Sequence, residues 1–343
     1  MKKILNILLN FVVFPALAIL LLYFAFKGID LKDIGYQLLT ANYWWILVSL
    51  VFAFGGFFFR ALRWRLLLQS VNQNPPIKTT VYAVIMAYFA NLAVPRLGEV
   101  VRCGTLKKTD NVSFEISFGT VITERVIDFI TLLIIILLVL VLDFNFFSSF
   151  FYENTVQPLS QKFSSFLLIL ILASIMGIIF IIMIWVYRKK LEHITFFSKI
   201  ISFFKGMYDG LMSIFHLKKV GLFLCYTVVI WTCYILMTYV VFFSIPATST
   251  LTFVDSMFVM SIGGLGMSAP VQNGFGAYHW IVSRGLMLFG ISQTNGLLYA
   301  TLSHESQTLM TLLLGPIAML LIMVYRKKSD KIKNNAFVNE KTI

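Results

Sequence analysis

Charged residues are scarce in this chain, and acidic residues are the scarcest of them. Of its 343 residues only 13% are charged, with 15 Asp and Glu against 28 Lys and Arg, whereas 59% are hydrophobic. Soluble domains carry about 25% charged and about 45–50% apolar residues, so this composition excludes a soluble globular enzyme. It predicts an all-α integral membrane protein, because several apolar runs approach the length that crosses a bilayer.

Cysteine is also rare, and the motifs of several enzyme classes are missing. Cys103, Cys225 and Cys233 have neither the spacing of a disulfide framework nor that of a zinc site, so no metal site and no cofactor are predicted. No Ser-His-Asp set, phosphate-binding loop or sugar-nucleotide motif is visible, so we predict no catalytic residues and no enzymatic activity. The basic residues lie in loops between apolar runs, which is typical of membrane topology and not of nucleic-acid binding.

About six apolar stretches predict membrane-spanning helices. They are residues 4–26, 44–59, 114–142, 163–187, 220–244 and 297–325. Two weaker apolar segments, residues 79–106 and 253–289, are interrupted in the middle by Asn, Pro and Gly. Unpaired backbone at such breaks cannot face lipid, so we predict two broken, re-entrant helical hairpins. The alternative is that both segments are ordinary two-helix hairpins or tilted spans.

Most Lys and Arg lie in one set of loops and in both terminal segments. The other set of loops holds only Lys27, Lys32, Lys162 and Arg284, diluted by acidic residues. Because positive charge accumulates on the cytoplasmic side, we predict a multi-pass protein with both termini in the cytoplasm.

The order helix, broken hairpin, helix occurs twice, in residues 44–142 and 220–325, and the two copies run in opposite directions. This predicts an inverted repeat within a single membrane domain covering residues 1–343, the usual architecture of a secondary transporter. Residues 192–219 mix Phe, Ile and Met with Lys. This pattern is typical of an amphipathic helix on the cytoplasmic membrane surface, and a simple connector is the alternative.

Charged residues inside membrane segments are costly and usually functional. Glu124 and Asp128 are four residues apart and share one helix face, and arginines from two other segments reach the same depth. We predict that these side chains bind an anionic lipid headgroup, because a guanidinium donates two parallel bonds to a phosphate. The predicted headgroup site consists of Arg60, Arg63, Asn91, Arg96, Glu99, Arg102, Glu124, Arg125 and Asp128.

The alternative is a buried ion-pair network that only joins helices, or arginines that extend to lipid headgroups. We prefer that structural interpretation for Arg65, Lys107 and Lys108.

Both broken segments contain residues that favour tight turns. The predicted turn residues are Pro95, Gly98, Pro270, Asn273, Gly274 and Gly276. Such a turn can direct the N-terminal amides of a half-helix at an anion, although glycine in membrane helices is also a packing device.

His279 and His304 lie within apolar segments, and Glu305 follows the second of them. Imidazole titrates near physiological pH, so a role in proton coupling is one hypothesis. The alternative is a pair of hydrogen-bonded core histidines.

Four sequence patterns occur in order along the chain. They are Arg60-Ala-Leu-Arg63, Asn91-Leu-Ala-Val-Pro95-Arg-Leu-Gly-Glu99, Glu124-Arg125-Val-Ile-Asp128, and Pro270 followed by Gly274-Phe-Gly276. Over nearly the whole chain this set resembles the lysylphosphatidylglycerol synthase transmembrane region, also called the flippase-like domain family. The resemblance implies an inner-membrane protein that handles anionic lipids or lipid-linked precursors.

Two departures from that family limit what the resemblance implies. Full synthases continue into a large cytoplasmic domain that transfers the aminoacyl group, and this sequence does not, so lysyl transfer is not expected. Many relatives carry a Glu where this chain has His279.

The leading hypothesis is translocation of an anionic phospholipid or a polyprenyl-phosphate-linked precursor across the inner membrane. The first alternative is an accessory subunit that does not transport but presents lipid to a partner glycosyltransferase or lipid synthase. A third, weaker interpretation is a membrane transferase that uses Glu124 or Asp128 as a base.

Overall fold

The computed structural model describes residues 31–143 and 212–340, together with residues 16, 19, 20, 22, 23 and 208. Within these residues every regular element is helical. The predicted spans 4–26 and 163–187 fall wholly or largely outside the described residues, as does most of the predicted amphipathic segment 192–219.

Four described helices are long and apolar enough to cross a membrane. They are α4 (Tyr43–Ser70), α7 (Phe114–Leu142), α12 (Val220–Val241) and α15 (Gln293–Glu340), the last apolar up to Lys327. They coincide with the predicted spans 114–142, 220–244 and 297–325 and extend beyond the predicted span 44–59, so a long apolar helix is confirmed at each of the four positions. In α7 only 11% of the most apolar 18-residue stretch is buried inside the protein. A surface of that kind requires lipid and not water around it.

Both weak apolar segments are broken helices. The first hairpin (residues 77–110) consists of α5 (Ile77–Ala93) and α6 (Gly98–Asp110), joined by a short turn. The second hairpin (residues 253–287) consists of α13 (Phe253–Met267) and α14 (Ala277–Met287), with the short 3-10 helix η6 (Gln272–Gly274) between them. The predicted interruptions are therefore real.

The remaining described elements are short. They are α3 (Leu31–Thr40), η3 (Met212–His216), η4 (Phe242–Ser244) and η5 (Pro246–Thr248).

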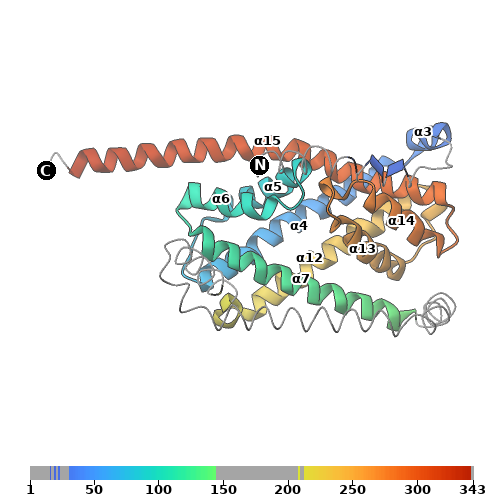
Figure 1. The fold of residues 1–343 in the computed structure, drawn as a ribbon, viewed down its shortest axis with the longest axis horizontal. Coiled ribbons are helices and arrows are strands. Elements are labelled where there is room, and N and C mark those ends of the chain that lie inside the picture. Colours follow the sequence, from blue (N-terminus) through green and yellow to red (C-terminus); the bar gives the residue numbers. More distant parts are fainter. Residues whose placement is uncertain are drawn as a thin grey trace, which may run out of the picture.

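Helices α4 and α12 run antiparallel along each other through the centre of the molecule (Figure 1). One end of the pair is fixed where the backbone N–H of Asn42 donates to the carbonyl of Ser244, at 2.8 Å. At the other end the Ser70 hydroxyl donates to the carbonyl of Ser213, also at 2.8 Å.

The hairpins pack on helices from the opposite half of the chain. The first hairpin contacts α15 through α5, and the second contacts α7 through α13. Each closing helix therefore covers the broken hairpin of the other half, so the two halves interlock.

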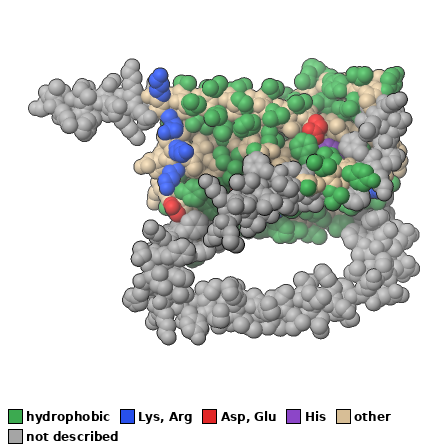
Figure 2. Space-filling view, turned by 45° about the horizontal axis from the view of Figure 1, so that its top comes forward, with side chains coloured by type: hydrophobic (Ala, Val, Ile, Leu, Met, Phe, Trp, Pro, Cys, Tyr) green, Lys and Arg blue, Asp and Glu red, His purple; other side chains and the backbone are tan. Residues whose placement is uncertain are grey.

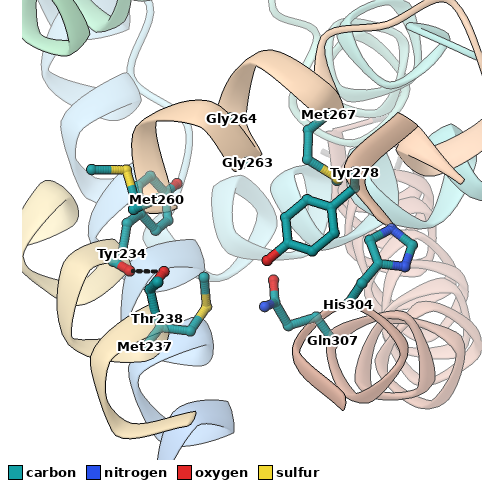
Figure 3. A pocket seen from close by; sticks show the side chains of 10 residues that line it. All are labelled: Tyr234, Met237, Thr238, Met260, Gly263, Gly264, Met267, Tyr278, His304 and Gln307. Atoms are coloured by element: carbon teal, nitrogen blue, oxygen red, sulfur yellow. Dashed lines mark hydrogen bonds between the residues drawn. The ribbon is translucent and has the colours of Figure 1, made fainter. Parts of the chain in front are cut away.

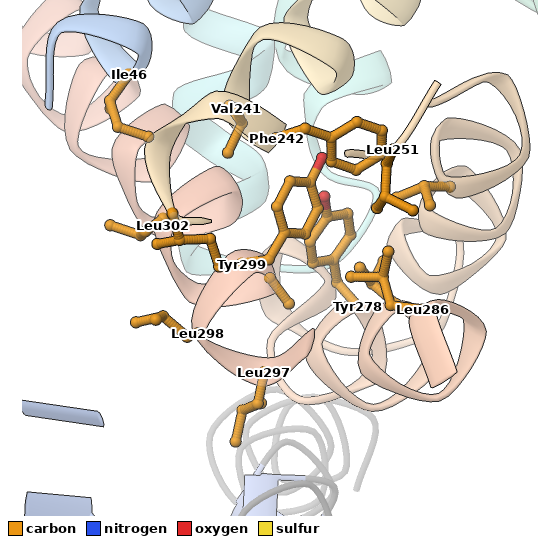
Figure 4. Packing of buried hydrophobic residues seen from close by; sticks show 14 residues of the cluster. Ile46, Val241, Phe242, Leu251, Tyr278, Leu286, Leu297, Leu298, Tyr299 and Leu302 are labelled. Carbon is orange, nitrogen blue, oxygen red and sulfur yellow. The ribbon is translucent and has the colours of Figure 1, made fainter. Parts of the chain in front are cut away.

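Each half has its own buried hydrophobic core. In the second half, Phe242, Tyr278 and Tyr299 pack with the aliphatic side chains of α14 and α15 (Figure 4). In the first half, Trp64 and Leu68 of α4 pack against Val84 of α5 and Leu106 of α6. These cores fix the hairpins against the long helices and so set the positions of their polar residues.

Candidate functional site

Three helices of the first half bring charged side chains together inside the molecule. Arg60 and Arg63 lie three residues apart on α4 and therefore point to one side. Arg102 comes from α6, and Glu124 with Asp128 from α7. We call these five residues the buried charge network.

Glu124 is the centre of this network. Its side chain is fully buried, and its Oε1 lies 3.0 Å from Arg60 NH1 and 3.5 Å from Arg63 NH2, while its Oε2 lies 2.9 Å from Arg102 NH1. A buried carboxylate needs such partners, because an unpaired one is strongly destabilising.

Asp128 is the second carboxylate. Its Oδ2 lies 2.9 Å from Arg60 NH2 and its Oδ1 lies 2.6 Å from Arg63 NH2. The prediction that Glu124 and Asp128 present their carboxylates on one helix face is therefore confirmed. Three guanidinium groups and two carboxylates leave the network with one excess positive charge.

Two nitrogens of the network lack a hydrogen-bond partner among the described residues. They are Arg63 Nε and Arg102 NH2, both buried. A buried donor without an acceptor costs about 1–3 kcal/mol. The excess charge and the unpaired donor of Arg102 together suit an anionic ligand.

Arg125 and Glu99 form a more exposed pair beside the network. Their side chains are 2.8 Å apart, and 49% of the Arg125 side chain is exposed. A small cavity of about 20 Å³ lies between this pair and the network, which is room for about one water molecule. It is lined by Arg60, Val84, Ala87, Tyr88, Asn91, Gly98, Glu99, Arg102 and Arg125.

Several aromatic and hydroxyl side chains that were not predicted from the sequence complete this region. The Tyr234 hydroxyl of α12 accepts a hydrogen bond from Arg60 Nε at 3.2 Å and lies 3.5 Å from the Tyr88 hydroxyl. The Arg102 guanidinium lies over the Trp64 ring, 4.6 Å from its centroid, as in a cation–π contact. Nothing in the sequence distinguishes these residues, since the chain contains 14 tyrosines and 6 tryptophans.

Arg96 lies outside the buried charge network, which corrects the prediction that five arginines meet there. It is exposed in the turn of the first hairpin with φ +59°, and its NH2 donates to the carbonyl of Ser268 at 2.8 Å. The physical reason is Pro95, which ends the preceding helix. The turn then directs residue 96 toward the second hairpin instead of toward α7.

Asn91 holds the turn of the first hairpin together. Its Oδ1 accepts a hydrogen bond from the backbone N–H of Gly98 at 2.7 Å. A Cβ at Gly98 would collide with the carbonyl oxygen of Ala87, so only glycine allows α6 to begin this close to α5. Asn91 and Gly98 therefore position the site, and Asn91 also lines its cavity.

The turn of the second hairpin contains Pro270 and three residues with positive φ. These are Asn273, Gly274 and Gly276, with φ of 49°, 71° and 78°. The Asn273 side chain donates to Thr308 Oγ1 of α15 at 2.8 Å. The predicted turn residues thus lie in the two turns, except Gly98, which begins α6, and the second turn is fastened to α15.

His279 and His304 also come together. His304 Nδ1 and His279 Nε2 lie 2.9 Å and 3.3 Å from the same Oε1 of Glu305. Both histidines are buried, and Glu305 is partly exposed. The hypothesis of proton coupling stays a prediction.

A larger cavity of about 130 Å³ lies between α12, the second hairpin and α15 (Figure 3). Its lining is mostly apolar, with the Tyr278 hydroxyl and the Gln307 amide directed into the space between α14 and α15 (Figure 3). Tyr234 lines this cavity as well. The same residue therefore separates it from the arginines of the first half.

The match of most of the chain to one family model shows which family it belongs to. Residues 7–315 match the model of the lysylphosphatidylglycerol synthase TM region. The chain belongs to this family. No curated protein and no solved structure matches it.

Membership of the lysylphosphatidylglycerol synthase TM family indicates a membrane role related to lipids. The four membrane-length helices agree with a multi-pass membrane protein. The residues by which the family was recognised in the sequence are those of the buried charge network and the two hairpin turns. In this member of the family several of them line the small cavity beside the network.

Proposed function

We propose that this protein moves an anionic phospholipid or lipid-linked precursor from one leaflet of the inner membrane to the other. Arg102 and Arg125 hold the phosphate of the headgroup, and the acyl chains stay in the bilayer. The observation that carries this proposal is the excess positive charge of the buried network, together with Arg102, which lines the cavity and whose NH2 is unpaired among the described residues.

The Arg125–Glu99 pair is the entry point. An exposed ion pair contributes only about 0–1 kcal/mol, so a phosphate displaces Glu99 at little cost. Once there, the phosphate accepts hydrogen bonds from Arg125 and Arg102, and charge-assisted bonds of this kind are worth about 1.5–3 kcal/mol each.

The next step is passage between the two cavities. Tyr88 and Tyr234 lie between the arginine side and the larger cavity, so a headgroup passes only when α12 and the first hairpin separate at these hydroxyls. The interlocked packing of α5 on α15 and of α13 on α7 supports an inverted repeat with hairpins entering from opposite faces. Rocking of one half against the other then opens each cavity in turn.

The proposed orientation places the basic end of the molecule in the cytoplasm. A row of Lys and Arg side chains lies at one end of the hydrophobic surface (Figure 2). Positive charge of this kind favours the cytoplasmic side and attracts anionic headgroups there.

The test is leaflet-resolved movement of acyl-labelled phosphatidylglycerol by the purified protein in vesicles, with labelled phosphatidylcholine as the zwitterionic comparison. The wild type moves the anionic lipid. Arg125→Gln, which removes a half-exposed charge, reduces the rate at least about tenfold, the equivalent of 1.4 kcal/mol.

The matched control is Arg65→Gln. Arg65 donates to the carbonyl of Pro75 and the side chain of Asn74 and takes no part in the network, so this variant keeps the wild-type rate. Equal rates for Arg125→Gln and wild type would reject the proposal.

The accessory subunit is the second candidate, and the small size of the arginine-lined cavity, about 20 Å³, favours it. It predicts that phosphatidylglycerol binds and that Arg125→Gln weakens binding, but that the purified protein moves no lipid.

Group transfer is the less favoured alternative. Glu124 faces three guanidinium groups and Asp128 two. Both carboxylates are engaged by guanidinium groups and neither is left free to face a substrate, so we propose transport and not catalysis.

A further inference from the structure

Three potential metal ligands converge where α14 meets α15. His304 Nδ1 lies 2.9 Å from Glu305 Oε1, and His279 Nε2 lies 3.3 Å from the same oxygen. The three ligand atoms are all within 4.8 Å of one another. Each residue therefore offers one donor atom within a space the size of a metal site.

The hydrogen bond on the far side of His304 fixes its tautomer. Its Nε2 lies 2.7 Å from the backbone carbonyl of Asn273, and a carbonyl only accepts, so Nε2 carries a hydrogen. In the neutral ring Nδ1 then carries no hydrogen and presents a lone pair. That lone pair faces the Glu305 carboxylate, and two acceptors at 2.9 Å need a cation between them.

The position of His279 favours a metal ion over a proton as that cation. A proton on His304 Nδ1 pairs His304 with Glu305, and His279 then reaches the same oxygen only through its own Nε2–H, at 3.3 Å, which is long for such a hydrogen bond. The His279 ring is buried, with 2% of its surface exposed, and its Nδ1 has no partner among the described residues. The polar contact of this ring is with the shared oxygen of Glu305. His279 Nε2 thus occupies the position expected for a third metal ligand.

The surroundings resemble the outer shell of a metal site. A histidine that binds a metal almost always donates its other ring N–H to a carbonyl or carboxylate, as His304 does to Asn273. The rings of Phe275 and Tyr278 lie 4.9 Å and 5.2 Å from the His304 ring and limit its rotation. Of the three residues, Glu305 is the most exposed, with 33% of its side chain at the surface. An acidic side chain and a histidine are visible within the hydrophobic face in Figure 2.

We propose that His279, His304 and Glu305 bind a divalent transition-metal ion of the Zn²⁺ class. Tetrahedral bonds of about 2.0–2.1 Å place ligand atoms about 3.3 Å apart, close to the two observed spacings. Two imidazoles and one carboxylate favour zinc and its neighbours over Mg²⁺ or Ca²⁺, which prefer oxygen ligands. The fourth position is left to water.

The ion joins the second hairpin to α15. His279 belongs to α14, and the His304 ring also holds the turn through Asn273. Metal binding therefore fastens the turn of the hairpin to the long helix. This inference does not depend on the proposed lipid transport.

The test uses the full chain, purified in detergent without a polyhistidine tag and stripped of metal with a chelator. Equilibrium dialysis against Zn²⁺, followed by elemental analysis, gives the stoichiometry and the Kd. The wild type binds one Zn²⁺ per chain, and Mg²⁺ does not compete. In His279→Gln, His304→Gln and Glu305→Gln the Kd rises at least about tenfold, as for lost ligands and their supports.

The matched control is His216→Gln, which removes a histidine at the end of η3 and keeps the wild-type Kd. Thermal unfolding is the second readout, because an ion that binds only the folded state stabilises it. Zn²⁺ raises the Tm of the wild type and of His216→Gln, and leaves that of Glu305→Gln unchanged.

Two results would overturn the proposal. One is monodisperse wild-type protein that retains no Zn²⁺, in which case protonated His304 is the partner of Glu305. The other is an unchanged Kd in the ligand variants. If His304→Gln fails to fold, His279→Gln and Glu305→Gln still decide, because neither removes the hydrogen bond to Asn273.

Discussion

Arg96, in the turn of the first hairpin, donates a hydrogen bond to the backbone carbonyl of Ser268, in the turn of the second, at 2.8 Å. The two residues are distant in sequence, and their contact joins the tips of the two hairpins. Ser268 caps the C-terminal end of α13, where the helix dipole favours a positive charge. The contact is thus a link between the two halves at their point of meeting.

Arg96→Gly tests that link without straining the backbone. Residue 96 has φ +59°, which glycine adopts at no steric cost, so the Tm is expected to stay within a few degrees of wild type. If the tips must stay together while the halves rock, lipid movement slows several-fold in the vesicle assay. Arg96→Lys keeps the charge and serves as the control, and a wild-type rate in Arg96→Gly would show that the tip contact has no part in transport.

Glu124 is fully buried and Glu99 is partly exposed, so neutralising these two carboxylates has different effects on stability. Glu124→Gln leaves three buried guanidinium groups poorly paired and is expected to cost about 3–5 kcal/mol. Glu99→Gln breaks a partly exposed pair with Arg125 and costs less than about 1 kcal/mol. Thermal or denaturant unfolding in detergent measures both, and equal losses in the two variants would contradict the burial described here.

Gly98 and Gly104 provide a matched pair on α6. Gly98→Ala forces a methyl group into the Ala87 carbonyl and separates α6 from α5, so a loss of stability is expected. Gly104 has nothing within 4 Å of an added Cβ, and alanine there stabilises the helix by up to about 1 kcal/mol. Opposite signs of the change in Tm are expected, and the prediction fails if both variants lose stability equally.

Tyr234→Phe removes the hydroxyl that accepts from Arg60 Nε. A lost hydrogen bond to a charged group costs about 1.5–3 kcal/mol, so the Tm falls. The hydroxyl also lies between the two cavities, so the rate of lipid movement is expected to change in Tyr234→Phe. Tyr36→Phe, at a side chain that is 69% exposed, serves as the control and leaves both properties unchanged.

Much of the buried charge network could be predicted because its residues lie close together in the sequence, in pairs on single helices. Arg60 and Arg63 on one helix, and Glu124 and Asp128 on another, lie on common faces by helix geometry alone. The low charge content of their surroundings then makes their mutual pairing the favoured solution. The breaks in both hairpins were equally visible, since proline and glycine act on the backbone directly.

The remainder depends on how helices are rotated and docked, which hydropathy does not encode. Tyr234 reaches Arg60 from α12, a helix whose apolar residues surround it almost evenly, so its inward face has no signature. Arg96 was misplaced because the outcome depends on the backbone conformation of one turn residue. The convergence of His279 on Glu305 required knowing how α14 lies against α15.

The interlocking of the two halves has a consequence for biogenesis. The first hairpin is synthesised long before α15, the helix on which α5 packs. Until that last helix is inserted, the polar turn of the first hairpin lacks its neighbour and the arginine-rich interior stays unfinished. A truncation that removes α15 should therefore leave the early segments exposed to quality-control proteases, and the two halves should be degraded together.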